Sequence, residues 1–435
     1  MITRDKNKII NIITLGCSKN LVDSEFLSCQ LEAHDVSVVH NNENSEADIV
    51  IINTCGFIND AKEESVDTIL HYVNAKKTES IRKLIVIGCL SQRYKEDLVK
   101  EISEVDLFLG TEEHQKLLES LGYSYNPNLI GERTITTPSH YSYLKISEGC
   151  NRQCSFCAIP SIRGKYKSKS VEELIRETRF LVSKGVKEIM LIAQDLTYYG
   201  MDMNQKKALE NIVGSISDIN GLDWIRLHYA YPVNFPKGLI TLMKERSNIC
   251  KYLDIPFQHI SDTVLRNMRR GNTKESTYSL IDYIKKNVPD ITLRTTLLVG
   301  HPGEMEKDFA ELKQFVTDVR FDRLGVFTYS EEEGTYAAAK YNDIIPEDIK
   351  KERAAEIMEL QQQISYEKNE QLIGKILKVI IDREEAEFFV GRTEGDSPEV
   401  DNEVLVRKGK QLVTGEFYNV KIIEADCFDL IGEIT

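Results

Sequence analysis

Residues 148–164 read EGCNRQCSFCAIPSIRG and hold Cys150, Cys154 and Cys157 in a Cys-x3-Cys-x2-Cys run. A 4Fe-4S cluster is normally held by four Cys thiolates, one for each iron. A loop with three thiolates therefore leaves one iron open, and open coordination positions are where metal centres do chemistry. Structural zinc, the alternative, prefers a closed set of four ligands. The loop predicts a catalytic iron–sulfur cluster.

The sequence around this loop alternates between strand-like and helical patterns. Six apolar runs, separated by amphipathic stretches, are SYLKIS, KEIMLIAQD, DWIRLHYAYP, KYLDIPFQ, ITLRTTLLVG and DRLGVFTYS. Six such repeats predict an open parallel (β/α)6 barrel, whose site lies at the carboxyl ends of the strands. The cysteine loop follows the first run, which places it at that face. Polar residues near the later strand ends are Gln194, Asp195, His228, Tyr229, Asp254, Gln258, Arg294, His301 and Glu304. Each could equally be a capping or core group.

The first 121 residues show a similar alternation. Buried runs such as IINIITLG and KLIVIGC are separated by helical stretches such as NLVDSEFLSCQLEA. This order predicts a doubly wound α/β domain with a parallel sheet. Toward the C-terminus, short alternating strands after a long helix predict a small antiparallel β-barrel.

Three cysteines of the first region follow predicted strands. Cys17 comes after IITLG, Cys55 after IVIINT and Cys89 after LIVIG. The carboxyl ends of parallel strands meet at one sheet edge, so these thiols could converge on a second cluster. A single Cys is as often a buried core residue. Three at equivalent strand ends favour the cluster, whereas we assign Cys29, Cys250 and Cys427 to packing.

Composition limits the choice of partner. The chain of 435 residues has a formal net charge of −14, and from Glu367 onward it has nine Lys and Arg against sixteen Asp and Glu. Phosphate recognition needs clustered cations, so direct nucleic-acid binding is disfavoured and a basic protein partner suits the chain better. An odd number of cysteines, with no secretory or membrane-spanning segment expected, indicates a soluble cytoplasmic protein.

Several motifs resemble those of the radical SAM (S-adenosylmethionine) methylthiotransferase family along essentially the whole chain. They are LGCSKNLVDSE (15–25), NTCGFI (53–58), GCNRQCSFCAIPSIRGKYKSKS (149–170), YLDIPFQH (252–259) and GRTEGDSPEVD (391–401). The resemblance implies four segments: an N-terminal methylthiotransferase domain with an auxiliary cluster (1–125), a linker (126–142), a radical SAM partial barrel (143–365) and a TRAM β-barrel (366–435). Lys167 and Lys169 stand where Arg is common, and His301 where Phe is usual; we expect His301 to fill the wall of the SAM site.

The resemblance also implies a chemistry with two 4Fe-4S clusters. The cluster on Cys150, Cys154 and Cys157 would bind and cleave SAM, and the one on Cys17, Cys55 and Cys89 would donate a methylated sulfur. Residues implied as SAM contacts are Gln194, Asp195, Arg294, Val299 and Gly300. An external donor such as flavodoxin would supply electrons.

Within the family, the chain most resembles the branch that modifies the β-carbon of an aspartate in small-subunit ribosomal protein S-twelve, and the resemblance implies this protein, free or on the ribosome, as the substrate. We expect the acidic TRAM barrel, through Glu399 and Asp401, to dock this basic protein. A tRNA adenosine substrate is the alternative, supported only by a basic stripe of Arg152, Arg163, Lys165, Lys167 and Lys169. An electron-transfer protein and a non-catalytic ribosome-binding factor are two further readings. An electron-transfer protein is disfavoured because electron carriers usually use four Cys for each cluster. A non-catalytic ribosome-binding factor would not cleave SAM.

Overall fold

The computed structural model describes residues 8–43 and 46–435. The charged start at residues 1–7, for which we expected no secretory role, lies outside this range, as do residues 44–45. The chain forms two compact units. One comprises residues up to Thr137 with Tyr143–Asn151 and Ala158–Phe180, and the other comprises Pro138–Ser142, Arg152–Cys157 and Leu181–Thr435. The chain therefore changes unit inside the cysteine loop.

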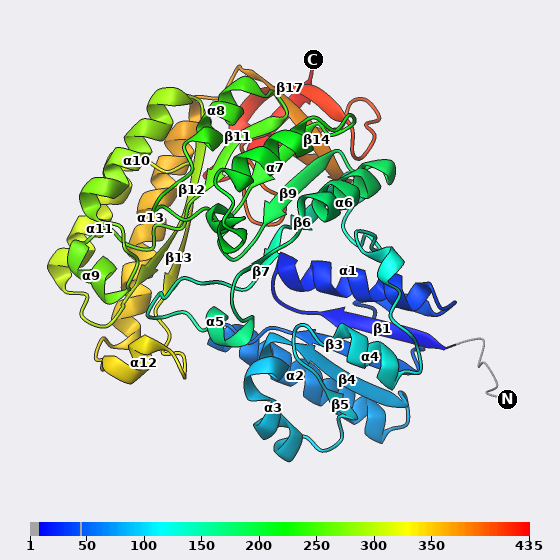
Figure 1. Ribbon diagram of the computed structural model, residues 1–435. Helices are drawn as coiled ribbons and strands as arrows, with labels where there is room; N and C mark the ends of the chain where they lie inside the picture. Colours follow the sequence, from blue (N-terminus) through cyan, green and yellow to red (C-terminus); the bar gives the residue numbers. More distant parts are fainter. Residues whose placement is uncertain (1–7, 44–45) are drawn as a thin grey trace. The chain divides into compact units, whose positions relative to one another are not determined.

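The first unit is built on a five-stranded parallel sheet of order β2-β1-β3-β4-β5 (Figure 1). Its strands are β1 (Ile9–Thr14), β2 (Ser37–His40), β3 (Ile49–Thr54), β4 (Lys83–Gly88) and β5 (Leu107–Phe108). The Ile- and Val-rich runs are buried on both faces, as parallel strands require. The edge strand β2 was not predicted, because its four residues, one exposed and three half-buried, form too short a run to give a clear period.

Helices cover both faces of this sheet. Leu27 and Leu31 of α1 (Ser18–Glu32) and Leu117 of α4 (His114–Ser120) pack in one core cluster. Ile69 of α2 (Asn59–Lys77) and Leu98 of α3 (Cys89–Glu101) pack in a cluster on the other face. The predicted doubly wound α/β architecture is confirmed. The unit also contains the short helix α5 (Ile159–Ile162) and the paired strands β7 (Ser147–Glu148) and β8 (Lys167–Ser168).

The predicted six-stranded sheet has the order β13-β12-β11-β10-β9-β6; strands β9 to β13 belong to the second unit, and β6 is divided between the two units. The strands are β6 (Tyr141–Lys145), β9 (Glu188–Ile192), β10 (Trp224–Leu227), β11 (Ile249–Asp254), β12 (Thr292–Val299) and β13 (Arg323–Thr328). Neighbouring strands from β9 to β13 pair in parallel. The longer helices between them are α6 (Val171–Ser183), α7 (Ala208–Ser217), α8 (Gly238–Glu245), α9 (Asp262–Asn267), α10 (Lys274–Asn287) and α11 (Glu306–Val319). The open (β/α)6 barrel is confirmed.

After α12 (Tyr336–Lys340) and the long helix α13 (Glu347–Glu370), five strands close a small barrel in the order β14-β15-β16-β18-β17. They are β14 (Ile376–Glu384), β15 (Phe388–Arg392), β16 (Val404–Arg407), β17 (Phe417–Ala425) and β18 (Leu430–Ile434). The barrel was predicted as antiparallel, but β16 and β18 run parallel. Strand directions cannot alternate all the way round a closed ring with an odd number of strands. Within the described residues, no helix is both long and apolar enough to span a bilayer.

Candidate functional site

Strand register brings Cys17, Cys55 and Cys89 to one edge of the first sheet. Thr14 of β1 pairs with Asn53 of β3, and Thr54 of β3 pairs with Gly88 of β4, so the three strands end at the same level. Cys17 precedes α1, Cys55 follows β3, and Cys89 is the first residue of α3.

Two glycines let the three cysteine loops touch. A Cβ added at Gly16 would lie 2.7 Å from the Cβ of Cys55 and 3.0 Å from its Sγ. A Cβ added at Gly56 would lie 2.7 Å from the backbone nitrogen of Leu90, beside Cys89. Only a residue without a side chain permits such an approach. The loops after β1, β3 and β4 are thus in contact, as the strand-end argument predicted.

Asn20 ties these loops together from inside the unit. Its side chain is fully buried, and Nδ2 donates to the carbonyl oxygens of Leu15 (2.9 Å) and Thr54 (3.1 Å). Its Oδ1 lies 3.9 Å from the Cys89 Sγ and accepts a hydrogen bond from Arg163. Asn20 therefore fixes the separation of two cysteine loops and contacts the third thiol.

The three thiols differ in acidity. Burial raises the pKa of Cys89 to about 11 against the opposing charge of Arg163, and burial also raises the pKa of Cys55. At Cys17, desolvation is outweighed by the charges of Lys19 and Arg163 and by backbone N–H groups, so the pKa of this thiol is lowered. Metal ligation requires thiolates, so cluster assembly would have to displace protons from Cys55 and Cys89.

Among the described residues, no three His, Cys, Asp or Glu side chains converge on a single metal ion. A 4Fe-4S cube makes a different demand, because each iron takes its own thiolate and the ligands surround the cube. Three thiols on touching loops, with a buried cation nearby, fit such a cluster in donor type.

A buried group of four charges borders these cysteines. Arg163 lies 3.2 Å from Asp23 and 3.0 Å from Glu148, and Lys145 contacts both carboxylates, with 2.8 Å to Glu148. Against the effect of burial, Lys145 and Arg163 hold the pKa of Glu148 well below its usual range. The four charges sum to zero, so the group is stable away from water only as a whole.

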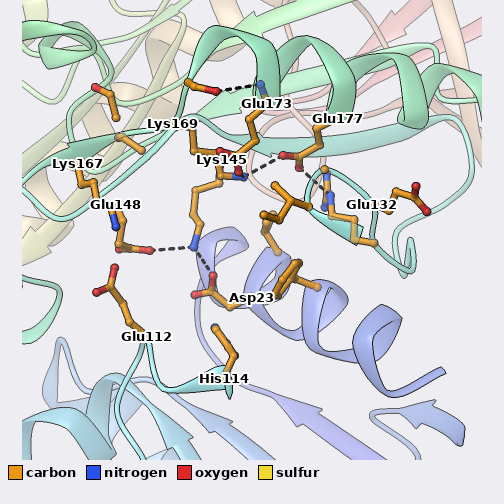
Figure 2. A pocket seen from close by; sticks show the side chains of 18 of the residues that line it. Asp23, Glu112, His114, Glu132, Lys145, Glu148, Lys167, Lys169, Glu173 and Glu177 are labelled. Atoms are coloured by element: carbon orange, nitrogen blue, oxygen red, sulfur yellow. Dashed lines mark hydrogen bonds and ion pairs between the residues drawn. The ribbon is translucent and has the colours of Figure 1, made fainter. Parts of the chain in front are cut away.

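Part of this group lines a cavity of about 370 Å³ in the first unit (Figure 2). Figure 2 shows Lys145 reaching between Asp23 and Glu148, while Lys169 pairs with Glu177 at 2.9 Å. The cavity wall is thus charged, and most of its cations are ion-paired with carboxylates of the same wall.

Three of the five residues in the predicted basic stripe are neutralised by ion pairs. Arg163 and Lys169 are ion-paired within the first unit, and Arg152 pairs with Asp195 at 2.6 Å within the second. Lys165 and Lys167 are exposed. Two exposed lysines give little of the clustered positive charge that a tRNA backbone requires.

Gly149 shapes the start of the three-cysteine loop. Its φ is +72°, and an added Cβ would lie 2.3 Å from the carbonyl oxygen of Lys165. The next residue, Cys150, donates its backbone N–H to the Gly164 carbonyl at 3.1 Å. The backbone around Cys150 is therefore folded tightly onto residues 164–165.

Cys154 and Cys157 lie in the second unit, where Arg270 was not predicted from sequence. The backbone N–H of Cys157 donates to the Cys154 carbonyl at 3.2 Å. Arg270 Nη1 lies 3.6 Å from the Cys154 Sγ, and its guanidinium stacks 4.3 Å from the ring centroid of Tyr231. Arg270 is a buried cation in contact with the Cys154 thiol. The two residues are 116 positions apart, so no local spacing in the sequence could show this contact.

Ser155 anchors the loop to the barrel. Its backbone donates to Met268 (2.9 Å) and accepts from Ala337 (2.7 Å), and its Oγ lies 3.1 Å from His301 Nε2. His301 is fully buried, with Tyr329 at 5.2 Å between ring centroids. His301 is therefore part of the buried packing under this loop, and its expected place in the wall of the SAM site stays a prediction.

The predicted SAM contacts occupy different positions in the barrel. Gln194 and Asp195 follow β9, and Asp195 accepts hydrogen bonds from Arg152 Nε (2.6 Å) and the Thr197 N–H (3.0 Å). Val299 ends β12, and the Gly300 N–H donates to Glu304 at 2.8 Å.

Arg294 is an exception among them. It was predicted near a strand end but is the third residue of β12, on the amino-terminal half of the strand. Its guanidinium is held by Asp254 (3.4 Å) and Asp401 (3.1 Å). The predicted run, residues 291–300, already has Arg294 as its fourth residue, so the expectation that Arg294 lies near the strand end is wrong.

Three segments match known families: residues 9–110 match UPF0004, described as an uncharacterized protein family, residues 144–316 the radical SAM superfamily, and residues 373–435 the TRAM domain. The radical SAM methyltransferase TsrM from Kitasatospora setae shares the fold, with TM-score 0.56 and 13% identity over 74% of this chain and 73% of that chain. OxsB, a cobalamin-dependent SAM radical enzyme, gives TM-score 0.53 and 13% identity over 82% of this chain and 56% of that chain. Fold and cysteine loop define a radical SAM enzyme.

Relatives cover the whole length. "Ribosomal protein uS12 methylthiotransferase RimO" of Bacteroides fragilis is 56% identical, over 99% of this chain and 100% of the relative. The proteins of the same description from Cytophaga hutchinsonii and Porphyromonas gingivalis are each 53% identical, over 98% of this chain and 98% and 99% of the relatives. The chain belongs to the RimO family of radical SAM methylthiotransferases.

Proposed function

We propose that this enzyme adds a methylthio group to the β-carbon of an aspartate in ribosomal protein uS12, the small-subunit protein S-twelve. The observation that carries the proposal is the full-length similarity to relatives described by that activity, 56% identical from end to end in the first case. The two separate sets of three cysteines support it, since each is suited to a cluster with one open iron.

In this proposal, Cys150, Cys154 and Cys157 hold the cluster that activates SAM, and Cys17, Cys55 and Cys89 hold the auxiliary cluster. When bound, the two 4Fe-4S clusters and SAM supply the electron, the radical and the transferred sulfur and methyl group. Around the cysteines, Gly149 permits the tight loop turn and Arg270 places a positive charge beside Cys154.

For SAM itself we propose contacts from Gln194, Asp195, Arg294 and the Val299–Gly300 backbone. Asp195 can act while held by Arg152, because a carboxylate has more than two acceptor sites. Arg294 would have to share a guanidinium that two carboxylates already engage. We therefore expect Arg294 to contribute least to SAM affinity.

We propose that the acidic TRAM barrel aids the approach of the basic substrate in the cytoplasm, with an external donor such as flavodoxin reducing the clusters. Glu399 is exposed and suits this role. Asp401 does not, because its side chain is 1% exposed and is bonded to Arg294 and Tyr252. Our expectation that Asp401 belongs to a docking surface is wrong, because its carboxylate turns inward. The sequence could not show this orientation.

The test is an anaerobic reaction with reconstituted clusters, SAM and a strong reductant, in which uS12 and unmodified tRNA are offered side by side. Mass spectrometry should find a methylthio-sized gain on one aspartate of uS12 and none on tRNA. A gain on tRNA alone would overturn the proposed substrate. If SAM is cleaved but neither product forms, free uS12 is not the substrate, and the reaction is repeated with assembled small ribosomal subunits.

A further inference from the structure

Arg163 is a buried cation that the reaction outlined above does not use. It directly follows α5, six residues after Cys157, and its side chain is 2% exposed. Its polar partners include Asn20, Asp23 and Glu148, all in the first unit.

Packing fixes this position. Ala158 and Ile162, at the two ends of the turn that forms α5, pack with Cys89 in one buried cluster. The turn closes on itself, since the N–H of Arg163 donates to the Ile159 carbonyl at 2.8 Å. The segment that leaves the three-cysteine loop therefore lies on Cys89 and delivers Arg163 beside the auxiliary cysteines.

The polar contacts orient the guanidinium as well. One terminal nitrogen faces the carboxylates of Asp23 and Glu148, and the other donates to Asn20 Oδ1. Asn20 in turn contacts the Cys89 thiol and holds the loops after β1 and β3. A planar, permanently charged fork held on several sides cannot move away when the charge of its neighbours changes.

We propose that Arg163 is a positioning residue of the auxiliary centre, where its fixed positive charge beside Cys89 raises the reduction potential of the cluster. This inference rests on the proposed assignment of Cys17, Cys55 and Cys89 to a cluster. Reduction adds an electron to a centre already surrounded by thiolates, and net charge, hydrogen bonds to sulfur and solvent exposure set its potential. A buried cation nearby favours the reduced form, because the attraction is weakly screened there.

The test uses the full chain carrying Cys150→Ala, Cys154→Ala and Cys157→Ala, which would retain only the auxiliary cluster. Its iron content is measured, and its reduction potential is determined by a titration followed by electron paramagnetic resonance. Arg163→Gln is compared with Arg163→Lys, which keeps the charge. Lys167→Gln is the matched control, since it removes the same charge from an exposed side chain of the same unit.

We expect Arg163→Gln to retain iron and to lower the potential by at least about 59 mV, a tenfold change for one electron. Arg163→Lys and Lys167→Gln should stay close to the parent chain. An unchanged potential in iron-loaded Arg163→Gln overturns the inference, and so does an equal drop in Arg163→Lys.

If Arg163→Gln fails to hold iron, Arg163→Lys decides. A loaded cluster with the parent potential supports the role of the charge, and loss of iron in both variants overturns the claim about potential. A parent chain that binds no cluster would instead refute the proposed auxiliary centre, which separates the two failures.

Discussion

Arg294 Nε lies 3.1 Å from Asp401 Oδ1, an ion pair that joins β12 of the radical SAM sheet to the loop between β15 and β16 of the TRAM barrel. The Asp401 carboxylate also accepts hydrogen bonds from the Tyr252 hydroxyl (2.7 Å) and the Ser397 N–H (2.9 Å). Arg294 reaches Asp254 at 3.4 Å. The TRAM loop therefore completes a buried polar network of the sheet.

The rest of this loop, residues 393–403, makes similar contacts. Arg323, the first residue of β13, donates to Asp396 at 2.9 Å, and Arg226 of β10 donates to the Glu394 carbonyl at 2.6 Å. Ser397 Oγ lies 3.0 Å from His228 Nε2. The TRAM barrel is thus a structural part of the radical SAM unit as well as a candidate surface for the substrate.

Replacing Asp401 with Asn should lower the free energy of unfolding by about 2 kcal/mol. Breaking one partner of a buried pair costs about 3–5 kcal/mol, and the 17% exposure of Arg294 reduces this. Urea unfolding followed by fluorescence measures it, because the single tryptophan, Trp224, packs 4.8 Å from Phe417 of the TRAM barrel. Glu387→Gln, at an exposed turn, should change stability by less than about 0.5 kcal/mol. Equal effects of the two variants would mean that the network adds nothing.

Gly149→Ala should prevent cluster binding at the three-cysteine loop. The new Cβ would meet the Lys165 carbonyl at 2.3 Å and push the backbone of Cys150 aside. Gly164→Ala is a matched control, because Gly164 has the same φ of +72° but nothing within 4 Å of an added Cβ. We expect it to keep its iron at a cost in stability of about 1–2 kcal/mol. Both glycine variants are made in a chain with Cys17→Ala, Cys55→Ala and Cys89→Ala, so that the iron content reports only the three-cysteine loop. Normal iron content in Gly149→Ala would contradict the steric argument.

Removing the auxiliary cysteines should halve the iron content. The chain with Cys17, Cys55 and Cys89 changed to Ala should fall from about eight to about four irons and should still cleave SAM. Methylthio transfer should be lost, because the proposed sulfur-bearing centre is missing. Cys29→Ala, on α1, should retain about eight irons. Iron analysis and product mass spectrometry check both, and retained transfer in the triple variant would exclude an auxiliary cluster on these residues.

His301 should make the metal-free protein sensitive to acid. Burial lowers the pKa of His301 to about 4 from an ordinary value near 6.5. Between these values the unfolded chain binds a proton that the folded chain does not, so stability falls as the pH drops from 6.5 toward 4. The largest loss is about 3 kcal/mol. His301→Phe, whose ring would suit the neighbouring Tyr329 and Phe156, should flatten this dependence. Urea unfolding at several pH values measures how the free energy of unfolding depends on pH. The same dependence in the parent protein and in His301→Phe would show that His301 is not its source.

Local sequence was sufficient for the elements and for the cysteines. Strand and helix periods span few residues, so the two parallel sheets and the small barrel could be predicted along the chain. The carboxyl ends of parallel strands meet by geometry, so the approach of Cys17, Cys55 and Cys89 followed from the strand pattern alone.

The charged partners of the sites were decided only by the tertiary structure. Arg163 meets Asp23 across 140 residues, Arg270 meets Cys154 across 116, and Arg294 meets Asp401 across 107. Such pairs leave no periodic signal, because an ion pair depends on where two distant segments come together in the fold. The sequence by itself determined which elements form and where the thiols gather, and the packing of distant segments decided which charges surround them.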